Sequence, residues 1–122
     1  MNATEANAVK AVRAVLRNYT GFSGRATRPE YWWFVAFTFT AGVALMIIDL
    51  VTGTGGLWTL FTLGTFLPSL AVTFRRLHDT GRAAWWLLIV LVPFLGPVIL
   101  VVWAATAGDP GPNKYGLAPA RT

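Results

Sequence analysis

Residues 75–82, which read Arg-Arg-Leu-His-Asp-Thr-Gly-Arg, form the densest group of polar side chains in the sequence. A histidine beside an aspartate can act as a general base, because the carboxylate orients the imidazole. Catalysis would also need a nucleophile or a metal site. The chain has no cysteine and His78 is its only histidine, too few for a usual zinc site. We therefore predict no enzyme activity, no metal and no cofactor, and a membrane-embedded enzyme using His78 and Asp79 is the least favoured alternative.

The same segment can instead have an architectural role. On a helix that continues briefly, Arg75 would meet His78 and Asp79 three and four residues on, within reach of an ion pair. We predict that Asp79 pairs with Arg75 or with the basic segment 25–28. The favoured interpretation is a polar hinge that caps helices and anchors them to phosphate headgroups. It assigns a polar network to Glu30, His78 and Asp79, and contacts with lipid headgroups or a partner to Arg25, Arg28, Arg75, Arg76 and Arg82.

Three long apolar runs surround this segment, at residues 31–51, 57–74 and 83–107. Hydrophobic residues make up 55% of the 122 residues and charged residues 12%, about half the charged share of a soluble domain. A helix of 21 residues rises roughly 30 Å, enough to cross the hydrocarbon core. We therefore expect one all-α domain, residues 1–122: a polytopic membrane protein with three transmembrane helices.

The third run leaves two alternatives open. Pro93, Gly96 and Pro97 interrupt it, so a helix crossing the membrane would be kinked at 93–97. The chain could also turn back there as a re-entrant hairpin. We favour the straight crossing, because each half alone is too short to span.

Residues 4–18 predict an amphipathic helix that precedes the spans. Apolar and basic residues recur on separate stripes at helical spacing, with Val9, Val12 and Leu16 on one and Lys10, Arg13 and Arg17 on the other. A basic, modestly apolar helix is typical of the membrane interface, and packing on a partner or on the spans is the alternative. Thr27 and Glu30 then have the spacing of a capping box for span one, and residues 108–122 predict an irregular tail.

Basic residues are distributed unevenly between the connectors. Five Lys or Arg precede span one and three lie in residues 75–82, against none in the connector 52–56 and two in the tail. The positive-inside rule then predicts a cytoplasmic N-terminus and, with three spans, an external C-terminus. Because the basic residues flank apolar spans, we expect no nucleic-acid partner.

Small and hydroxylated residues form stripes within the first two spans. Such residues permit close helix approach and interhelical hydrogen bonds. We predict helix packing through Ala36, Thr40, Ala44, Thr62, Ser69 and Thr73, with a polar pore lining as the less favoured alternative. Asp49 lies about one turn from the outer end of span one, and we favour a solvated residue or a helix-end contact over a transport role.

Three motifs occur in order: NYTGFSGRATRPEYW at residues 18–32, FRRLHDTGR at 74–82 and GDPGPNKYG at 108–116. On these motifs the chain, from about Val9 to Gly116, resembles the YhaH-like family of bacterial inner-membrane proteins, known as domain of unknown function 805. The resemblance implies a bacterial cytoplasmic membrane and a small helical bundle. It carries no established activity, catalytic residue or cofactor.

The function that we favour is association in the membrane. Six tryptophans and eight phenylalanines present broad apolar surface to lipid and to partner helices. The leading hypothesis is a non-enzymatic accessory subunit of a membrane complex or a self-assembling scaffold, with an anionic bilayer, other membrane subunits or further copies as partners. The competing hypothesis is a small oligomeric channel or transporter lined by the threonine stripe and Asp49.

Overall fold

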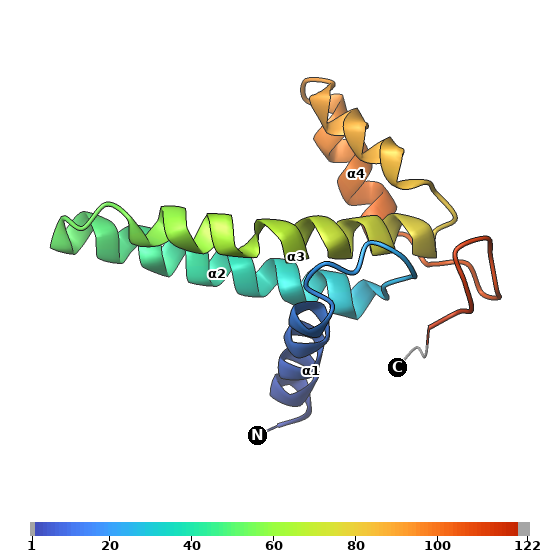
Figure 1. Ribbon diagram of the computed structural model, residues 1–122, viewed down its shortest axis with the longest axis horizontal. Coiled ribbons are helices and arrows are strands. Elements are labelled where there is room, and N and C mark those ends of the chain that lie inside the picture. Colours follow the sequence, from blue (N-terminus) through green and yellow to red (C-terminus); the bar gives the residue numbers. More distant parts are fainter. Residues whose placement is uncertain (1, 120–122) are drawn as a thin grey trace.

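The computed structural model describes residues 2–119, and every regular element in that range is helical. The order along the chain is α1 (Ala3–Arg17), α2 (Arg28–Thr52), α3 (Leu57–Asp79), the 3₁₀-helix η1 (Ala84–Leu91) and α4 (Leu95–Ala105). Figure 1 shows α2 and α3 side by side as one long hairpin. In that view the η1–α4 pair projects from the end of the hairpin opposite the α2–α3 connector, and α1 projects from the same half toward the opposite side.

Local sequence signals explain where α2 begins and ends. The Thr27 hydroxyl oxygen accepts a hydrogen bond from the Glu30 amide at 3.3 Å. Pro29 lies in the first turn, where an amide hydrogen would have no partner within the helix, so its absence costs nothing. Gly53 ends the helix in the left-handed conformation, at φ 73°. The N-cap is therefore as predicted. The predicted reciprocal bond from the Thr27 amide to the Glu30 carboxylate is wrong, because that carboxylate pairs with Arg75 instead.

Helix α3 contains a proline and continues beyond the predicted end at residue 74, through the polar residues to Asp79. Pro68 has no amide hydrogen, so the carbonyl of Gly64 loses its donor one turn on. The hydroxyl of Tyr19, in the loop after α1, donates to this carbonyl. The contact satisfies a backbone group that an apolar environment would leave without a partner.

The apolar surface of α2 and α3 faces outward. Both helices are long and apolar enough to cross a membrane, and only 17% of the residues in the most apolar stretch of each are buried inside the protein. The core helix of a soluble protein would be mostly buried. These two helices therefore present apolar side chains to their surroundings along most of their length.

Residues 83–107 form a hairpin of two short arms in place of the predicted single kinked helix, and its entry into a membrane stays a prediction. The chain turns at Phe94, whose φ is 65°, and α4 returns along η1. Gly96 lies so close to the carbonyl of Ile89 that a Cβ there would clash. Trp86 and Trp103 make an edge-to-face contact across the arms, with ring centroids 5.7 Å apart. The two prolines and the glycine of residues 93–97 allow this close turn.

The hairpin also changes where the tail lies. Since α4 returns to the end of α3 from which η1 departed, residues 109–116 lie against Arg25 and Asp79. We predicted the tail on the membrane side opposite to the N-terminal segment. In the structure the tail instead lies beside that segment, because the third run does not pass along the length of α2 and α3.

Helix α1 packs on α2 and α3 through its apolar side. Its N-terminus has a capping box between Asn2 and Glu5. Ala11 and Val15 are buried, and Val15 joins Ala26, Phe34 and Val72 in a small core. Packing on the spans was the alternative to an interfacial helix, and the position of α1 relative to a bilayer stays a prediction.

Candidate functional site

Most buried charge lies where α3 ends beside the segment that leads into α2. We call the following six side chains the polar cluster: Arg25, Glu30, Arg75, Arg76, His78 and Asp79. The amide of Ala26 donates to the carbonyl of Arg75 at 3.0 Å, which holds the segment before α2 alongside the last turns of α3. The last turns of α3 supply four of the six residues, the segment before α2 supplies Arg25, and the first turn of α2 supplies Glu30.

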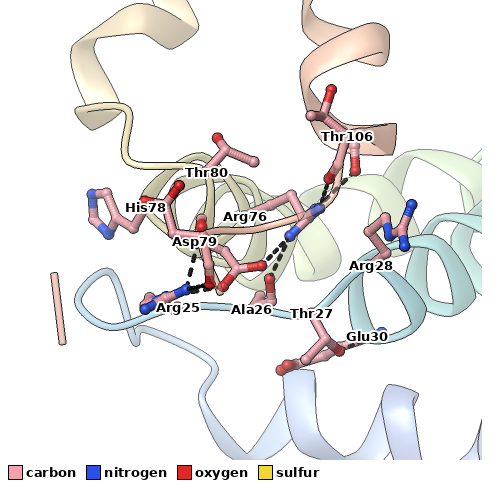
Figure 2. Close-up of polar contacts among 12 residues, drawn as sticks. Arg25, Ala26, Thr27, Arg28, Glu30, Arg76, His78, Asp79, Thr80 and Thr106 are labelled. Atoms are coloured by element: carbon pink, nitrogen blue, oxygen red, sulfur yellow. Dashed lines mark hydrogen bonds and ion pairs between the residues drawn. The ribbon is translucent and has the colours of Figure 1, made fainter. Parts of the chain in front are cut away.

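Asp79 is at the centre of the polar cluster. Its carboxylate is 0% exposed and lies between two guanidinium groups (Figure 2). Arg25 Nε donates to Oδ1 at 2.9 Å, and Arg76 Nη1 donates to Oδ2 at 2.5 Å. The predicted pairing of Asp79 with segment 25–28 is therefore confirmed, and within α3 its partner is Arg76 rather than Arg75. Each oxygen of the carboxylate is engaged by a cation, the arrangement that a buried charge requires.

Arg25 fixes the tail through backbone carbonyls. Its Nη2 donates to the carbonyl of Asp109 at 2.6 Å, and its Nη1 donates to those of Gly111 at 2.8 Å and Gly116 at 3.2 Å. The amide of Asp109 in turn donates to the carbonyl of Asp79 at 2.7 Å. One guanidinium thus orders a segment that has no helix or strand to satisfy its own carbonyls.

Arg76 donates hydrogen bonds to carbonyls at the end of α4. Its Nε donates to the carbonyl of Ala104 at 2.8 Å, its Nη2 to that of Thr106, and its Nη1 to that of Ala26 at 2.9 Å (Figure 2). The last carbonyls of a helix have no partner within the helix. Two residues of α2 add donors, with Trp32 Nε1 at 3.2 Å from the Ala104 carbonyl and Arg28 Nη1 at 3.3 Å from that of Ala105.

Arg75 and Glu30 connect α3 to the first turn of α2. Arg75 Nη1 lies 2.9 Å from Glu30 Oε1, and both side chains are largely buried. Arg75 Nε and Nη2 are buried and have no hydrogen-bond partner among the described residues. The ion pair therefore adds a second link between the two long helices at the end that carries Asp79.

His78 is held from three directions. Its Nδ1 is 3.0 Å from the carbonyl of Gly24, so that nitrogen carries the proton. The ring stacks on Tyr115 with centroids 4.1 Å apart, and the carbonyl of His78 accepts from Asn113 Nδ2 at 2.9 Å. Through these contacts His78 joins α3, the segment before α2 and the tail, which is a structural role.

The polar cluster is suited to holding segments together. The Asp79 carboxylate, which would have to orient the His78 imidazole for general-base catalysis, is enclosed between Arg25 and Arg76. Removing one member of a buried ion pair typically costs about 3–5 kcal/mol, because the other charge is left uncompensated. Such a cluster specifies one arrangement of α2, α3, α4 and the tail.

Three of the five arginines predicted to contact lipid headgroups or a partner do not face outward. Arg25, Arg75 and Arg76 are buried and bonded within the chain, so the prediction is wrong for them. Arg25 bonds to the tail and Arg76 to the end of α4, two segments that a straight crossing would have carried away from them. Arg28 is exposed, and Arg82 lies over the ring of Trp103 at 4.5 Å. For these two, a headgroup contact stays a prediction.

The predicted packing stripes lie in different places. Ala36, Thr40 and Ala44 line a crevice between α1 and α2. The contact between α2 and α3 includes the ring of Phe37 against that of Phe61, and Gly42 against the Trp58 indole. Thr62 and Ser69 border a small pocket between α2 and α3, and the Thr73 hydroxyl donates to the carbonyl of Ser69.

Asp49 makes the helix-end contact that was favoured over transport. Its Oδ1 accepts from the Leu57 amide and its Oδ2 from the Trp58 amide, both at 3.0 Å, and Thr54 Oγ1 donates to Oδ1 at 2.6 Å. The first amides of α3 have no partner within the helix and carry its positive dipole. The carboxylate supplies the cap that Gly56 lacks.

Three residues of the site were not predicted. Asp109, Asn113 and Tyr115 bring the tail to His78 and Arg25. Asn113 also donates to Asp109 Oδ2 at 2.9 Å and accepts from the Tyr115 amide at 2.8 Å. All three belong to the motif at residues 108–116. That motif showed that the tail has a specific sequence, but it did not show what the tail contacts.

The fold and this site define a small helical membrane protein with a buried polar cluster at one end of its long hairpin. Comparison with known proteins agrees. Residues 19–117 match the family described as protein of unknown function (DUF805), and the chain belongs to that family. The resemblance seen in the three motifs is therefore confirmed.

Curated relatives come from Escherichia coli. The chain is 47% identical to inner membrane protein YhaH of strain K12 over 111 residues, which cover 86% of this chain and 92% of YhaH. It is 46% identical to inner membrane protein YhaI over 108 residues, covering 87% and 92%. The uncharacterized protein YiiR is 28% identical over 127 residues, covering 78% and 83%. No solved structure matches the chain.

Proposed function

We propose that this protein is a non-enzymatic component of the bacterial cytoplasmic membrane that acts by associating with other membrane proteins or with further copies of itself. The observation that carries the proposal is the outward-facing apolar surface of α2 and α3, of which so little is buried within the chain. Large side chains such as Phe39, Leu60 and Leu63 are well exposed. In a bilayer this surface meets lipid tails and other helices, and helix association there proceeds by close packing.

The contacts of the polar cluster support the non-enzymatic part of the proposal. Its arginines bond to carbonyls and carboxylates of the same chain, and the Asp79 carboxylate is enclosed. A residue that takes a proton from a substrate must be within hydrogen-bond reach of it. On this view the polar cluster stabilises the shape that the apolar surface presents.

We further propose that both termini are cytoplasmic and that the connector at 53–56 is external. All ten Lys and Arg residues fall within residues 10–28, 75–82 and 114–121, and none in the connector at the other end of the long hairpin. The positive-inside rule favours this orientation. The arms of the η1–α4 hairpin, of 8 and 11 residues, each reach about 16 Å, half of a bilayer core. The hairpin then enters the cytoplasmic leaflet, with Phe94 near its deepest point.

Cysteine labelling tests this topology, because the natural chain contains no cysteine. Single-cysteine variants at Thr54 and at Pro119 would be treated in intact cells with a maleimide that crosses the outer membrane but not the inner membrane. Thr54→Cys should be labelled, and Pro119→Cys only after the inner membrane is permeabilised. Labelling of Pro119→Cys in intact cells would disprove a cytoplasmic tail.

Site-specific photocrosslinking tests the association. A photoreactive amino acid would replace Phe39 or Leu63 on the outer faces, and Phe34, which is buried, as the matched control. The outer positions should give a reproducible crosslink, identified by mass spectrometry as one membrane protein or a second copy, and the control should crosslink within the chain. Adducts with lipid alone at both outer positions would argue against association.

A further inference from the structure

An apolar crevice of about 860 Å³ lies between α1 and α2. The side chains of Val9, Val12 and Leu16 form one wall, and Trp33, Ala36 and Phe37 are part of the other. Its volume falls within the range of roughly 300–1,000 Å³ found for ligand sites. The crevice is open to the surroundings, so a ligand can enter it from the side of the molecule.

Two charged side chains line this crevice, and both are cationic. Arg13 and Arg17 are one helical turn apart on α1 and exposed, and no acidic residue is among the described residues that line the space. Neither guanidinium has a hydrogen bond or ion pair with another described residue. They differ in this from Arg25 and Arg76, whose donors are used inside the protein.

This combination specifies an amphipathic ligand. Apolar walls beside a bilayer favour hydrocarbon chains over water, because water would find few polar partners there. Guanidinium groups bind phosphate oxygens through charge-assisted, often bidentate, hydrogen bonds. We propose that the crevice binds one anionic phospholipid, with its acyl chains against α2 and its phosphate on Arg13 and Arg17.

Charge complementarity favours a lipid over a second copy of the chain. The protein has a net charge of +5, and α1 carries three basic residues against the single acid Glu5. Another copy docking here would bring like charges toward Arg13 and Arg17. The lipid site does not depend on whether the protein has protein partners, so it stands or falls apart from the proposed function.

Native mass spectrometry of the purified full-length chain tests the site. The protein would be mixed in detergent with phosphatidylglycerol or with phosphatidylcholine of the same acyl chains, and then released from the detergent in the spectrometer. The natural chain should retain one phosphatidylglycerol with a preference of about tenfold or more over phosphatidylcholine, because each arginine near an anionic headgroup adds attraction. The variant Arg13→Gln/Arg17→Gln should lose that preference.

Two further variants control for charge and for space. Lys10→Gln/Lys114→Gln removes the same net charge from residues that do not line the crevice, and it should keep the preference within about twofold. Ala36→Phe/Ala44→Phe fills the crevice without a charge change and should reduce lipid retention, whereas Val43→Phe, outside the lining, should not.

Three results would overturn the proposal: equal retention of the two lipids by the natural chain, an unchanged preference in the double glutamine variant, or a dimer without lipid that the crevice-filling variant abolishes. The arginine variants should fold, since neither residue bonds to the described part of the chain. Their unfolding by tryptophan fluorescence would be measured alongside.

Discussion

The two ends of the α2–α3 hairpin each carry an aspartate at a helix terminus, and the two carboxylates do different work. Asp79 is fully buried between two guanidinium groups from different segments. Asp49 is partly exposed and accepts from two amides at the start of α3 and from one hydroxyl. The first joins distant parts of the chain and the second caps a neighbouring helix, so burial and partners decide the role of the residue type.

The surroundings of the two ends differ in the same way. Around Asp79, segments from the beginning, middle and end of the chain meet through arginine side chains. Around Asp49, the chain makes a short connector, and Leu50 and Val51 are exposed. We infer that tertiary structure is specified at the polar cluster, whereas the far half of the hairpin depends on the pairing of two helices and on the surrounding lipid.

The largest effect is expected for Asp79→Leu. It leaves Arg25 and Arg76 buried without their carboxylate, and a broken buried ion pair costs about 3–5 kcal/mol. Asp79→Asn keeps the shape of the side chain and one acceptor oxygen, so it should lower the free energy of unfolding less than Asp79→Leu does. Thermal unfolding in mild detergent, followed by tryptophan fluorescence, measures both. A melting temperature for Asp79→Leu equal to that of the natural chain would mean that the polar cluster does not stabilise the fold.

Arg25→Gln should rank second. Asp79 keeps Arg76, but the carbonyls of Asp109, Gly111 and Gly116 lose a charged donor, a loss of about 2–3 kcal/mol. Hydrogen–deuterium exchange should rise across residues 109–116 and remain low in α2. The control is Arg28→Gln, an exposed residue that donates to the Ala105 carbonyl and not to the tail, so a loss of about 1 kcal/mol without faster exchange in residues 109–116 is expected. Equal protection of the tail in both variants would contradict the assigned role of Arg25.

The comparison also explains which parts of the fold the sequence could predict. Hydropathy and the Thr27–Pro29 start are local signals, and they placed α2 and α3 within a few residues. The pairing of Asp79 with segment 25–28 followed from placing both on one side of the membrane. Local pattern could not decide whether residues 83–107 cross or return, because 25 apolar residues satisfy either length.

The missed contacts share one physical cause. Arg25 bonds to carbonyls more than 80 residues away in sequence, at Asp109, Gly111 and Gly116. A backbone acceptor leaves no trace in residue type, so the tail could be recognised as a motif but not placed. The closeness of Gly96 to the Ile89 carbonyl was visible only as a glycine between two prolines.

A smaller effect is expected between the two ends, at Tyr19. Tyr19→Phe removes the donor to the Gly64 carbonyl and should cost about 1 kcal/mol. Pro68→Ala returns an amide that can bond to the same carbonyl, so Tyr19→Phe should cost much less in that background. A double-mutant cycle from thermal unfolding gives the coupling. Additive effects would show that the hydroxyl does not replace the missing amide.

The smallest loss of stability is expected for Asp49→Asn, at the far end. Asparagine keeps one acceptor oxygen for the Leu57 amide or the Thr54 hydroxyl, but its NH₂ group cannot accept from Trp58, and the negative charge at the positive end of α3 is lost. The amides of Leu57 and Trp58 should therefore exchange faster, while the melting temperature falls less than in Tyr19→Phe. Thr54→Val is the matched control, because it removes one donor to Asp49 and leaves the carboxylate on both amides. If Asp49→Asn instead increased exchange in residues 109–116, the two ends would be coupled through the α2–α3 pair, and stability could not be assigned to the polar cluster alone.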